Sequence, residues 1–251
     1  MSGWVAIAGL GPGDSRLWTA EVAEVLEQAT DIVGYTPYVA RVPDRAGLSK
    51  HASDNRVEIE RATHALQLAQ EGRRVVVVSS GDPGVFAMAS AMFEAVEAGP
   101  EAFRDLDISV LPGVTAMLAA SAAAGAILGH DFCAINLSDN LKPWALIEKR
   151  LHLAIEADFA CAFYNPRSKA RPEGFGRALA LIQGTCESGR LITFARAVAT
   201  PEETLTTVTL AEATPEMADM RTVVLLGSSL TRRIVRPGRA DIVYTPRSVP
   251  E

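Results

Sequence analysis

The chain has 251 residues, of which 48% are hydrophobic and 22% charged, and its formal net charge is −6. This length supports one or two globular domains with real cores, and the acidic balance argues against a nucleic-acid-binding surface. No segment approaches the roughly 20 apolar residues of a membrane span, and the amino terminus lacks the regions of a signal peptide. We therefore expect a cytoplasmic protein without nucleic-acid or membrane partners.

Strands and helices are predicted to alternate through the first half of the chain. The run Val75–Val78 is typical of a parallel strand buried on both faces, and apolar residues recur elsewhere at helical spacing. The predicted strands are 5–8, 32–34, 75–78 and 108–111, and the predicted helices are 17–29, 59–71 and 85–98. This alternation predicts a mainly parallel α/β sheet.

The second half predicts another α/β domain with a mixed sheet. Its strands are expected at 132–137, 159–164, 191–195, 204–210 and 223–227, and little helical sequence separates the last three. The small-residue segment 117–126 should form a helix that packs very closely against a neighbour. We place the domain boundary near residue 112, so that the domains are 1–112 and 113–251.

The segment SSGDPGVFAMAS (residues 79–90) joins the valine strand to the next helix. In an open α/β sheet, ligands bind at the carboxyl ends of the strands. Glycines allow close backbone approach, and Asp82 adds a charged acceptor. The segment therefore predicts a small-molecule site, with a plain strand-to-helix turn as the alternative.

The loop GLGPGD (residues 9–14) resembles a dinucleotide-binding fingerprint only poorly. Asp14 stands where the third glycine belongs, and Pro12 removes a backbone N–H that a pyrophosphate needs. S-adenosylmethionine has no phosphate and carries a positive sulfonium, so carbonyl oxygens and carboxylates suit it better. The sequence thus favours S-adenosylmethionine over a dinucleotide.

The cysteines and histidines show neither disulfide nor metal-site patterns. The three cysteines are far apart, and the four histidines lack metal-ligand spacing. We expect buried free cysteines and no metal.

Several motifs together resemble the tetrapyrrole (class III) methyltransferases, which use S-adenosylmethionine in cobalamin and sirohaem synthesis. GLGPGD, GDPGVFAM and PGVTAMLAASAAAGA occur in the family's order. VGYTPYV, HDFCAINLSDNLKPW and YNPRSKAR resemble members that methylate precorrin-3B at carbon 17 and contract the macrocycle in aerobic cobalamin synthesis. The resemblance covers nearly the whole chain.

The resemblance implies a bilobal homodimer that holds cofactor and macrocycle in a cleft between its two domains. The residues implied for S-adenosylmethionine are Pro12, Gly81, Asp82, Pro83, Val85, Phe86, Thr115, Ala116, Phe163 and Ala197. For Thr115 and Ala116, the alternative is a helix start packed on small residues.

Ring contraction calls for a general base that removes the proton of the carbon 20 hydroxyl. His130, Asp131, Asp139 and Tyr164 are the candidates, because they lie in or beside the segments typical of the ring-contracting members. The alternatives are a helix cap for His130 and a turn for Asp139.

The substrate's acetate and propionate groups call for basic partners. Arg167, Lys169 and Arg171 form a compact basic segment, and Arg196 ends a predicted strand. An ordinary exposed loop is the alternative for the basic segment.

Two departures from the family pattern bear on these assignments. Phe86 and Ala87 replace a tyrosine and a glycine, and Ala199–Thr200 replaces an expected glycine–arginine pair. The rival functions are methylation of a sibling precorrin or cobalt-precorrin, and non-catalytic transport of a tetrapyrrole. Loss of cofactor binding would favour the carrier.

Overall fold

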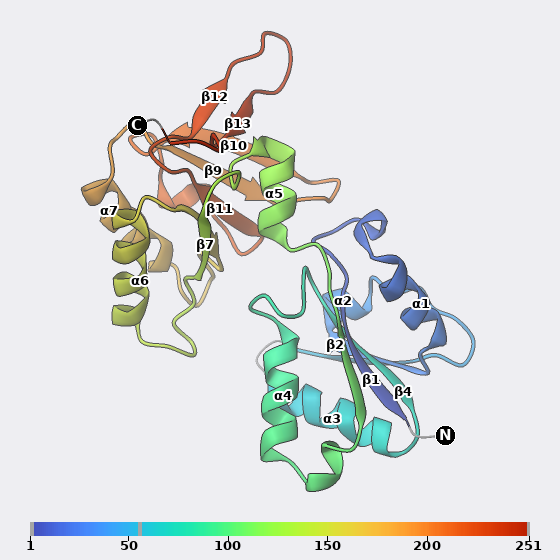
Figure 1. The fold of residues 1–251 in the computed structure, drawn as a ribbon. Coiled ribbons are helices and arrows are strands. Elements are labelled where there is room, and N and C mark those ends of the chain that lie inside the picture. The colour runs from blue at the N-terminus through green and yellow to red at the C-terminus, as the bar shows by residue number, and fades with distance from the viewer. Residues whose placement is uncertain (1–2, 55–56, 250–251) are drawn as a thin grey trace. The chain divides into compact units, whose positions relative to one another are not determined.

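The computed structural model describes residues 3–54 and 57–249. The chain divides into two compact units, Met1–Thr115 and Ala116–Glu251. Each unit contains one five-stranded sheet with helices on both of its faces (Figure 1).

The sheet of the first unit is entirely parallel among the described strands, which confirms the predicted arrangement. Its strands are β1 (Trp4–Gly9), β2 (Asp31–Tyr35), β3 (Ser49–Ser53), β4 (Arg74–Ser79) and β5 (Asp107–Leu111). Their spatial order is β3-β2-β4-β1-β5. The valine run lies in β4, one of the three inner strands, and is fully buried.

Helices cover both faces of this sheet (Figure 1). They are α1 (Ala20–Gln28), α2 (Thr36–Val39), α3 (Glu58–Gln70) and α4 (Met88–Ala98), with 3₁₀ turns at Ser15–Leu17 and Glu101–Phe103. Alternate residues of β4 point to opposite faces. Val76 and Val78 therefore pack on the α1 side, and the other two valines pack under α3 and α4.

Two predicted helices begin later than expected. Thr19 caps α1, because its Oγ1 accepts from Val22 N at 3.2 Å, so the preceding residues form a separate 3₁₀ turn. Helix α4 begins at Met88, because Phe86 adopts a left-handed φ of 55° that a helix cannot accommodate. The loop after β4 is therefore two residues longer than predicted.

The second unit has the predicted mixed sheet. Its strands are β7 (Phe132–Asn136), β8 (Ala160–Tyr164), β9 (Leu191–Arg196), β10 (Thr204–Thr209) and β11 (Thr222–Leu226), in the order β10-β9-β11-β8-β7. Only β7 and β8 pair in parallel within this sheet.

The predicted small-residue helix is α5 (Ala116–Ala124). Its Ala120 and Ala124 pack on one face of the mixed sheet, among residues that include Ala162. Helices α6 (Trp144–Glu156) and α7 (Gly174–Thr185) cover the other face, and a 3₁₀ turn at Pro215–Met217 follows β10. A methyl-sized side chain is what lets the α5 backbone approach the sheet closely.

A small third sheet interrupts the end of the predicted helix. Gly125 and Ala126 form β6, which pairs with β13 (Ile242–Tyr244), and β13 pairs in turn with β12 (Arg232–Ile234). Gly125 has a φ of 137°, which only glycine adopts without strain.

Candidate functional site

The first unit has a topological switch point between β1 and β4. From β1 the chain runs through α1 to β2 on one side, and from β4 it runs through α4 to β5 on the other. Ligands of open α/β sheets bind at the carboxyl ends of the strands at such a point. Loop 10–14 after β1 and loop 80–87 after β4 lie there.

These two loops are joined backbone to backbone. Gly11 N donates to Gly81 O at 3.2 Å, and Gly81 N donates to Gly11 O at 3.0 Å. A Cβ on Gly9 would lie 2.6 Å from Gly81 O, and a Cβ on Gly113, in the loop after β5, would lie 2.3 Å from the same oxygen. Three loops thus converge at a distance that only glycine permits.

Asp82 links the second of these loops to the third. Its Oδ1 accepts from Gly84 N at 2.8 Å, and its Oδ2 accepts from Gly113 N at 3.1 Å. Both carboxylate oxygens therefore accept hydrogen bonds from backbone N–H groups. The structure gives Asp82 a positioning role, and its predicted contact with a cofactor stays a prediction.

Four glycines of these loops do not offer their N–H groups to a phosphate. The N–H groups of Gly11, Gly81, Gly84 and Gly113 already donate to protein oxygens, and Pro12 and Pro83 have none. A phosphate site needs free backbone donors. These four N–H groups are therefore unavailable to a phosphate, and the preference of the loops for an adenosyl ligand without phosphate stays a prediction.

The other cofactor residues predicted in this unit differ in exposure. Pro83 and Thr115 are buried, Pro12 and Val85 are half-buried, and Phe86 is 48% exposed. Ala116 is the first residue of α5 in the second unit.

Sequence reasoning missed Arg41, which follows α2. Its guanidinium donates to Gly11 O at 3.0 Å, to Gly13 O at 2.9 Å and to Leu10 O. A single arginine that binds distant backbone has no sequence signature, and the neighbouring VGYTPYV segment was the one available signal.

In the second unit, the carboxyl ends of β7, β8 and β9 share one edge of the sheet. Strand β7 is parallel to β8, and β11 is antiparallel to both β8 and β9. This edge collects Asp139 after β7, Tyr164 and the basic segment at β8, and Arg196 at the end of β9. The structure thus brings together most of the predicted catalytic and substrate residues.

His130 is not brought to this edge. It precedes β7 and lies at the amino end of that five-residue strand, with Nδ1 3.8 Å from Asp131 Oδ2. A strand of five residues is about 16 Å long. His130 is therefore separated from Asp139 and Tyr164 by the length of β7.

Tyr164 joins this edge to the start of α5. Its hydroxyl oxygen accepts from Met117 N at 3.0 Å, in the first turn of the helix that follows Thr115 and Ala116. The carboxylate of Asp139 is exposed. Tyr164 thus contacts a segment that is predicted to bind the cofactor, and its catalytic role stays a prediction.

The basic segment after β8 is a compact turn. Arg167 Nε donates to Pro172 O at 3.1 Å, and Ser168 and Arg171 exchange backbone hydrogen bonds. Lys169 is exposed. Arg167 shapes the loop, and Lys169 is the more accessible cation.

Lys142, which sequence reasoning did not select, adds to this basic group. Burial, followed by repulsion from Arg150 and Arg171, lowers the pKa of Lys142. Arg196, by contrast, is already paired with Asp219 at 2.7 Å.

Two predicted cofactor residues of this unit contribute little side chain. Phe163 is fully buried in the core under α6 and α7, so only its backbone can reach a ligand. Ala197 is buried, with a left-handed φ of 49°. Left-handed backbone at a non-glycine residue is strained and clusters at functional sites.

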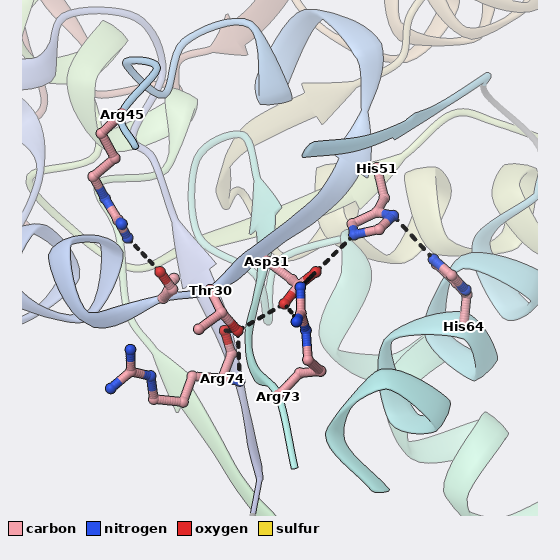
Figure 2. A network of polar contacts seen from close by, with 8 residues as sticks. Thr30, Asp31, Arg45, His51, His64, Arg73 and Arg74 are labelled. Carbon is pink, nitrogen blue, oxygen red and sulfur yellow. Dashed lines mark hydrogen bonds and ion pairs between the residues drawn. The ribbon is translucent and has the colours of Figure 1, made fainter. Parts of the chain in front are cut away.

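A polar network marks the opposite edge of the first sheet (Figure 2). The buried carboxylate of Asp31 accepts from Arg73 Nε at 2.7 Å and bonds to His51 Nε2 at 2.8 Å, and His51 Nδ1 lies 3.3 Å from His64 Nε2. Asp31 begins β2, far along the strands from the glycine loops. We assign this network to stability.

Neither a metal cluster nor a membrane helix was found in the part of the chain that the structure describes. Residues 3–54 and 57–249 contain no group of three or more His, Cys, Asp or Glu able to hold a metal ion. Within the same ranges, every helix is too short or too polar to span a bilayer.

Comparison with known proteins shows similarity to methyltransferases of one family. Residues 5–214 match the family of Tetrapyrrole (Corrin/Porphyrin) Methylases. A precorrin-3B C(17)-methyltransferase of Sinorhizobium sp is 48% identical over 98% of this chain and 97% of its own. The crystal structure of the methyltransferase CobJ has a TM-score of 0.93 and 66% identity, covering 98% of this chain and 100% of that one.

A more distant structure shares the fold. Uroporphyrin-III C-methyl transferase from Thermus thermophilus, complexed with S-adenosyl homocysteine, has a TM-score of 0.66 at 20% identity. It covers 90% of this chain and 97% of its own.

Proposed function

Because the chain belongs to the tetrapyrrole methylase family, we propose that it transfers the methyl group of S-adenosylmethionine to carbon 17 of precorrin-3B. In the proposed reaction the macrocycle contracts, and carbon 20 leaves the ring as an acetyl group on carbon 1, which gives precorrin-4. The chain is a methyltransferase of cobalamin biosynthesis. Similarity to a precorrin-3B C(17)-methyltransferase along almost the whole chain carries the finer assignment.

The glycine loops of the first unit support the choice of cofactor. S-adenosylmethionine supplies an electrophilic methyl group on a sulfonium. Loops 10–14, 80–87 and 112–115 would bind it through backbone carbonyls and through Pro12, Val85, Phe86 and Thr115, since they lie at the switch point. The N–H groups of Gly11, Gly81, Gly84 and Gly113 already donate within the protein and are not available to a phosphate. The close packing of the loops fixes the bound orientation, which is the main demand of an in-line displacement.

The edge of the second unit supports the choice of substrate. Lys169, Arg171 and Lys142 would bind acetate and propionate groups of the macrocycle, and Arg167 would hold the loop that carries two of them. These cations form a basic group in a chain whose formal net charge is −6.

Two groups at this edge are candidates for the general base. Asp139 is exposed where β7 ends, and Tyr164 ends the neighbouring β8. Removal of the carbon 20 hydroxyl proton would start the migration that contracts the ring. Asp139 is the first choice, because the hydroxyl of Tyr164 already contacts α5.

We further propose that the protein acts in the cytoplasm as a homodimer. A sibling precorrin or cobalt-precorrin substrate remains the rival within the family, and a non-catalytic carrier is the rival outside it. The exposed Phe86, in place of a tyrosine, is the departure most relevant to the carrier.

Turnover of defined substrates tests the proposal. Purified protein is incubated anaerobically with S-adenosylmethionine and either precorrin-3B or its cobalt-containing counterpart, and the products are analysed by mass spectrometry. One added methyl and a releasable acetyl group from precorrin-3B would support it. Turnover of the cobalt compound alone would transfer the assignment to the sibling reaction.

A further inference from the structure

Arg41 makes an unusual set of contacts with the first glycine loop. One guanidinium donates to the carbonyls of Leu10, Gly11 and Gly13, and none of these partners is charged. We propose that Arg41 is a positioning residue that fixes the backbone of loop 10–14 for S-adenosylmethionine. The inference rests on the proposed function, because it assigns this loop to the cofactor.

The loop needs an external support. Its glycines lose more conformational freedom on folding than other residues do, and Gly11 adopts a left-handed φ of 62°. Bonds to Ser79 and Gly81 engage the loop on its β4 side. Arg41 engages its carbonyls from another element, so the loop is held by two independent sets of contacts.

The charge of Arg41 has no other described use. No ion pair joins Arg41 to a carboxylate in residues 3–54 and 57–249. Burial lowers its pKa, yet an arginine keeps its proton at any physiological pH. The three carbonyl dipoles therefore compensate a permanent, half-buried charge.

Only a guanidinium can make this set of bonds. Its Nη1 and Nη2 point in different directions from one rigid plane, so two nitrogens reach three carbonyls. A lysine presents one nitrogen at the end of a flexible chain. Lysine preserves the charge of Arg41 but not the geometry.

The helix before Arg41 holds it in place and also approaches the second loop. Val39 and Val42 are buried in the core on the α1 side of the sheet. Burial raises the pKa of the Tyr38 phenol, and a hydrogen bond with Ser80, in the loop after β4, acts in the opposite direction. Residues 38–42 thus contact both loops.

Arg45 provides a matched control. It also donates to backbone carbonyls, but those of Leu26 and Ala29 at the end of α1 instead of those of the glycine loops. Arg45→Lys should therefore lower the free energy of unfolding, as Arg41→Lys does, without weakening S-adenosylmethionine binding.

The experiment measures affinity for S-adenosylmethionine by calorimetry and steady-state kinetics in the wild type, Arg41→Lys and Arg45→Lys. We expect the Kd of Arg41→Lys to rise about tenfold, as the loss of one or two charge-assisted hydrogen bonds would give. Its KM for S-adenosylmethionine should rise in parallel, with kcat at saturation nearly unchanged. Arg45→Lys should keep the wild-type Kd.

Hydrogen–deuterium exchange of the ligand-free variants gives a readout that does not depend on activity. Arg41→Lys should speed exchange in loop 10–14, and Arg45→Lys should speed it near residues 26–30. Equal Kd values and equal exchange of loop 10–14 in the two variants would overturn the inference alone. A wild type that does not bind S-adenosylmethionine would overturn both the inference and the proposed function.

Discussion

Asp82 and Gly113 connect two loops of the first unit through one hydrogen bond, in which Gly113 N donates to Asp82 Oδ2 at 3.1 Å. The other carboxylate oxygen accepts from Gly84 N at 2.8 Å. A residue that the sequence offers as a ligand contact thus also organises the backbone around it. Its mutation should change binding through the position of the loops.

Asp82→Ala should weaken binding of S-adenosylmethionine about tenfold and lower the free energy of unfolding by about 1–3 kcal/mol, because two backbone donors lose their acceptor. Calorimetry and chemical denaturation measure the two effects. Asp105→Ala, at an exposed position, is the control and should change neither. Unchanged affinity in Asp82→Ala would remove Asp82 from the account of the cofactor site.

Ala199→Gly should stabilise the protein by about 0.5 kcal/mol, because Ala199 has a φ of 60° that glycine adopts without strain. The sequence resemblance also places a glycine there. The matched control is Ala122→Gly, at an exposed position within α5, which should destabilise by about 1 kcal/mol. Denaturation midpoints that shift in the same direction in both variants would contradict this reading of the backbone.

Asp31→Asn should remove a pH-dependent part of the stability. Burial alone would raise the pKa of Asp31, but hydrogen bonds from Arg73, Thr30 and His51 lower it to about 2. A lowered pKa stabilises the fold above the ordinary value near 4, and the contribution is lost as the pH falls through about 2. The shift corresponds to about 2 kcal/mol at neutral pH.

Denaturation of the wild type and Asp31→Asn between pH 7 and pH 2 checks this prediction. The difference in unfolding free energy should be largest at pH 7 and should shrink below about pH 4. Asp44→Asn, at an exposed carboxylate that pairs with Lys50, should have little effect at any pH. A difference that stays constant down to pH 2 would show that the ionised carboxylate is not the stabilising group.

Lys169→Glu should weaken precorrin-3B binding and leave S-adenosylmethionine affinity unchanged, since Lys169 is exposed and makes no described hydrogen bond that shapes its loop. Fluorescence or absorption titration with each ligand separates the two affinities. Arg239→Glu makes the same change of charge at another exposed position of this unit and should affect neither. If both variants weaken precorrin-3B binding equally, the effect comes from the change in net charge and not from the position of Lys169.

The sequence predicted most of the elements whose pattern reflects burial, but it missed helices α6 and α7, whose apolar faces are buried against the second sheet. The valine run is β4, and the alternating elements form the expected parallel sheet. Strand β3, SKHAS, was missed because an edge strand needs no apolar run. The small third sheet was missed because β6 is only two residues long.

Site residues were predicted where the local sequence carries a signal and were missed where a role depends on distant contacts. Glycines at strand ends carry a local signal, and Gly81 lies among the converging loops. His130 and Asp139 share one sequence motif, but β7 lies between them and takes them to opposite edges. Arg41 acts on carbonyls about 30 positions away, and no local pattern encodes such a contact. The cleft between the domains stays a prediction.

The most direct test of the central claim is anaerobic turnover of precorrin-3B with methyl-labelled S-adenosylmethionine, followed by mass spectrometry of the product. The expected product carries one labelled methyl group and bears an acetyl group on carbon 1 of a contracted ring. A protein that binds S-adenosylmethionine but leaves precorrin-3B unmethylated would contradict it.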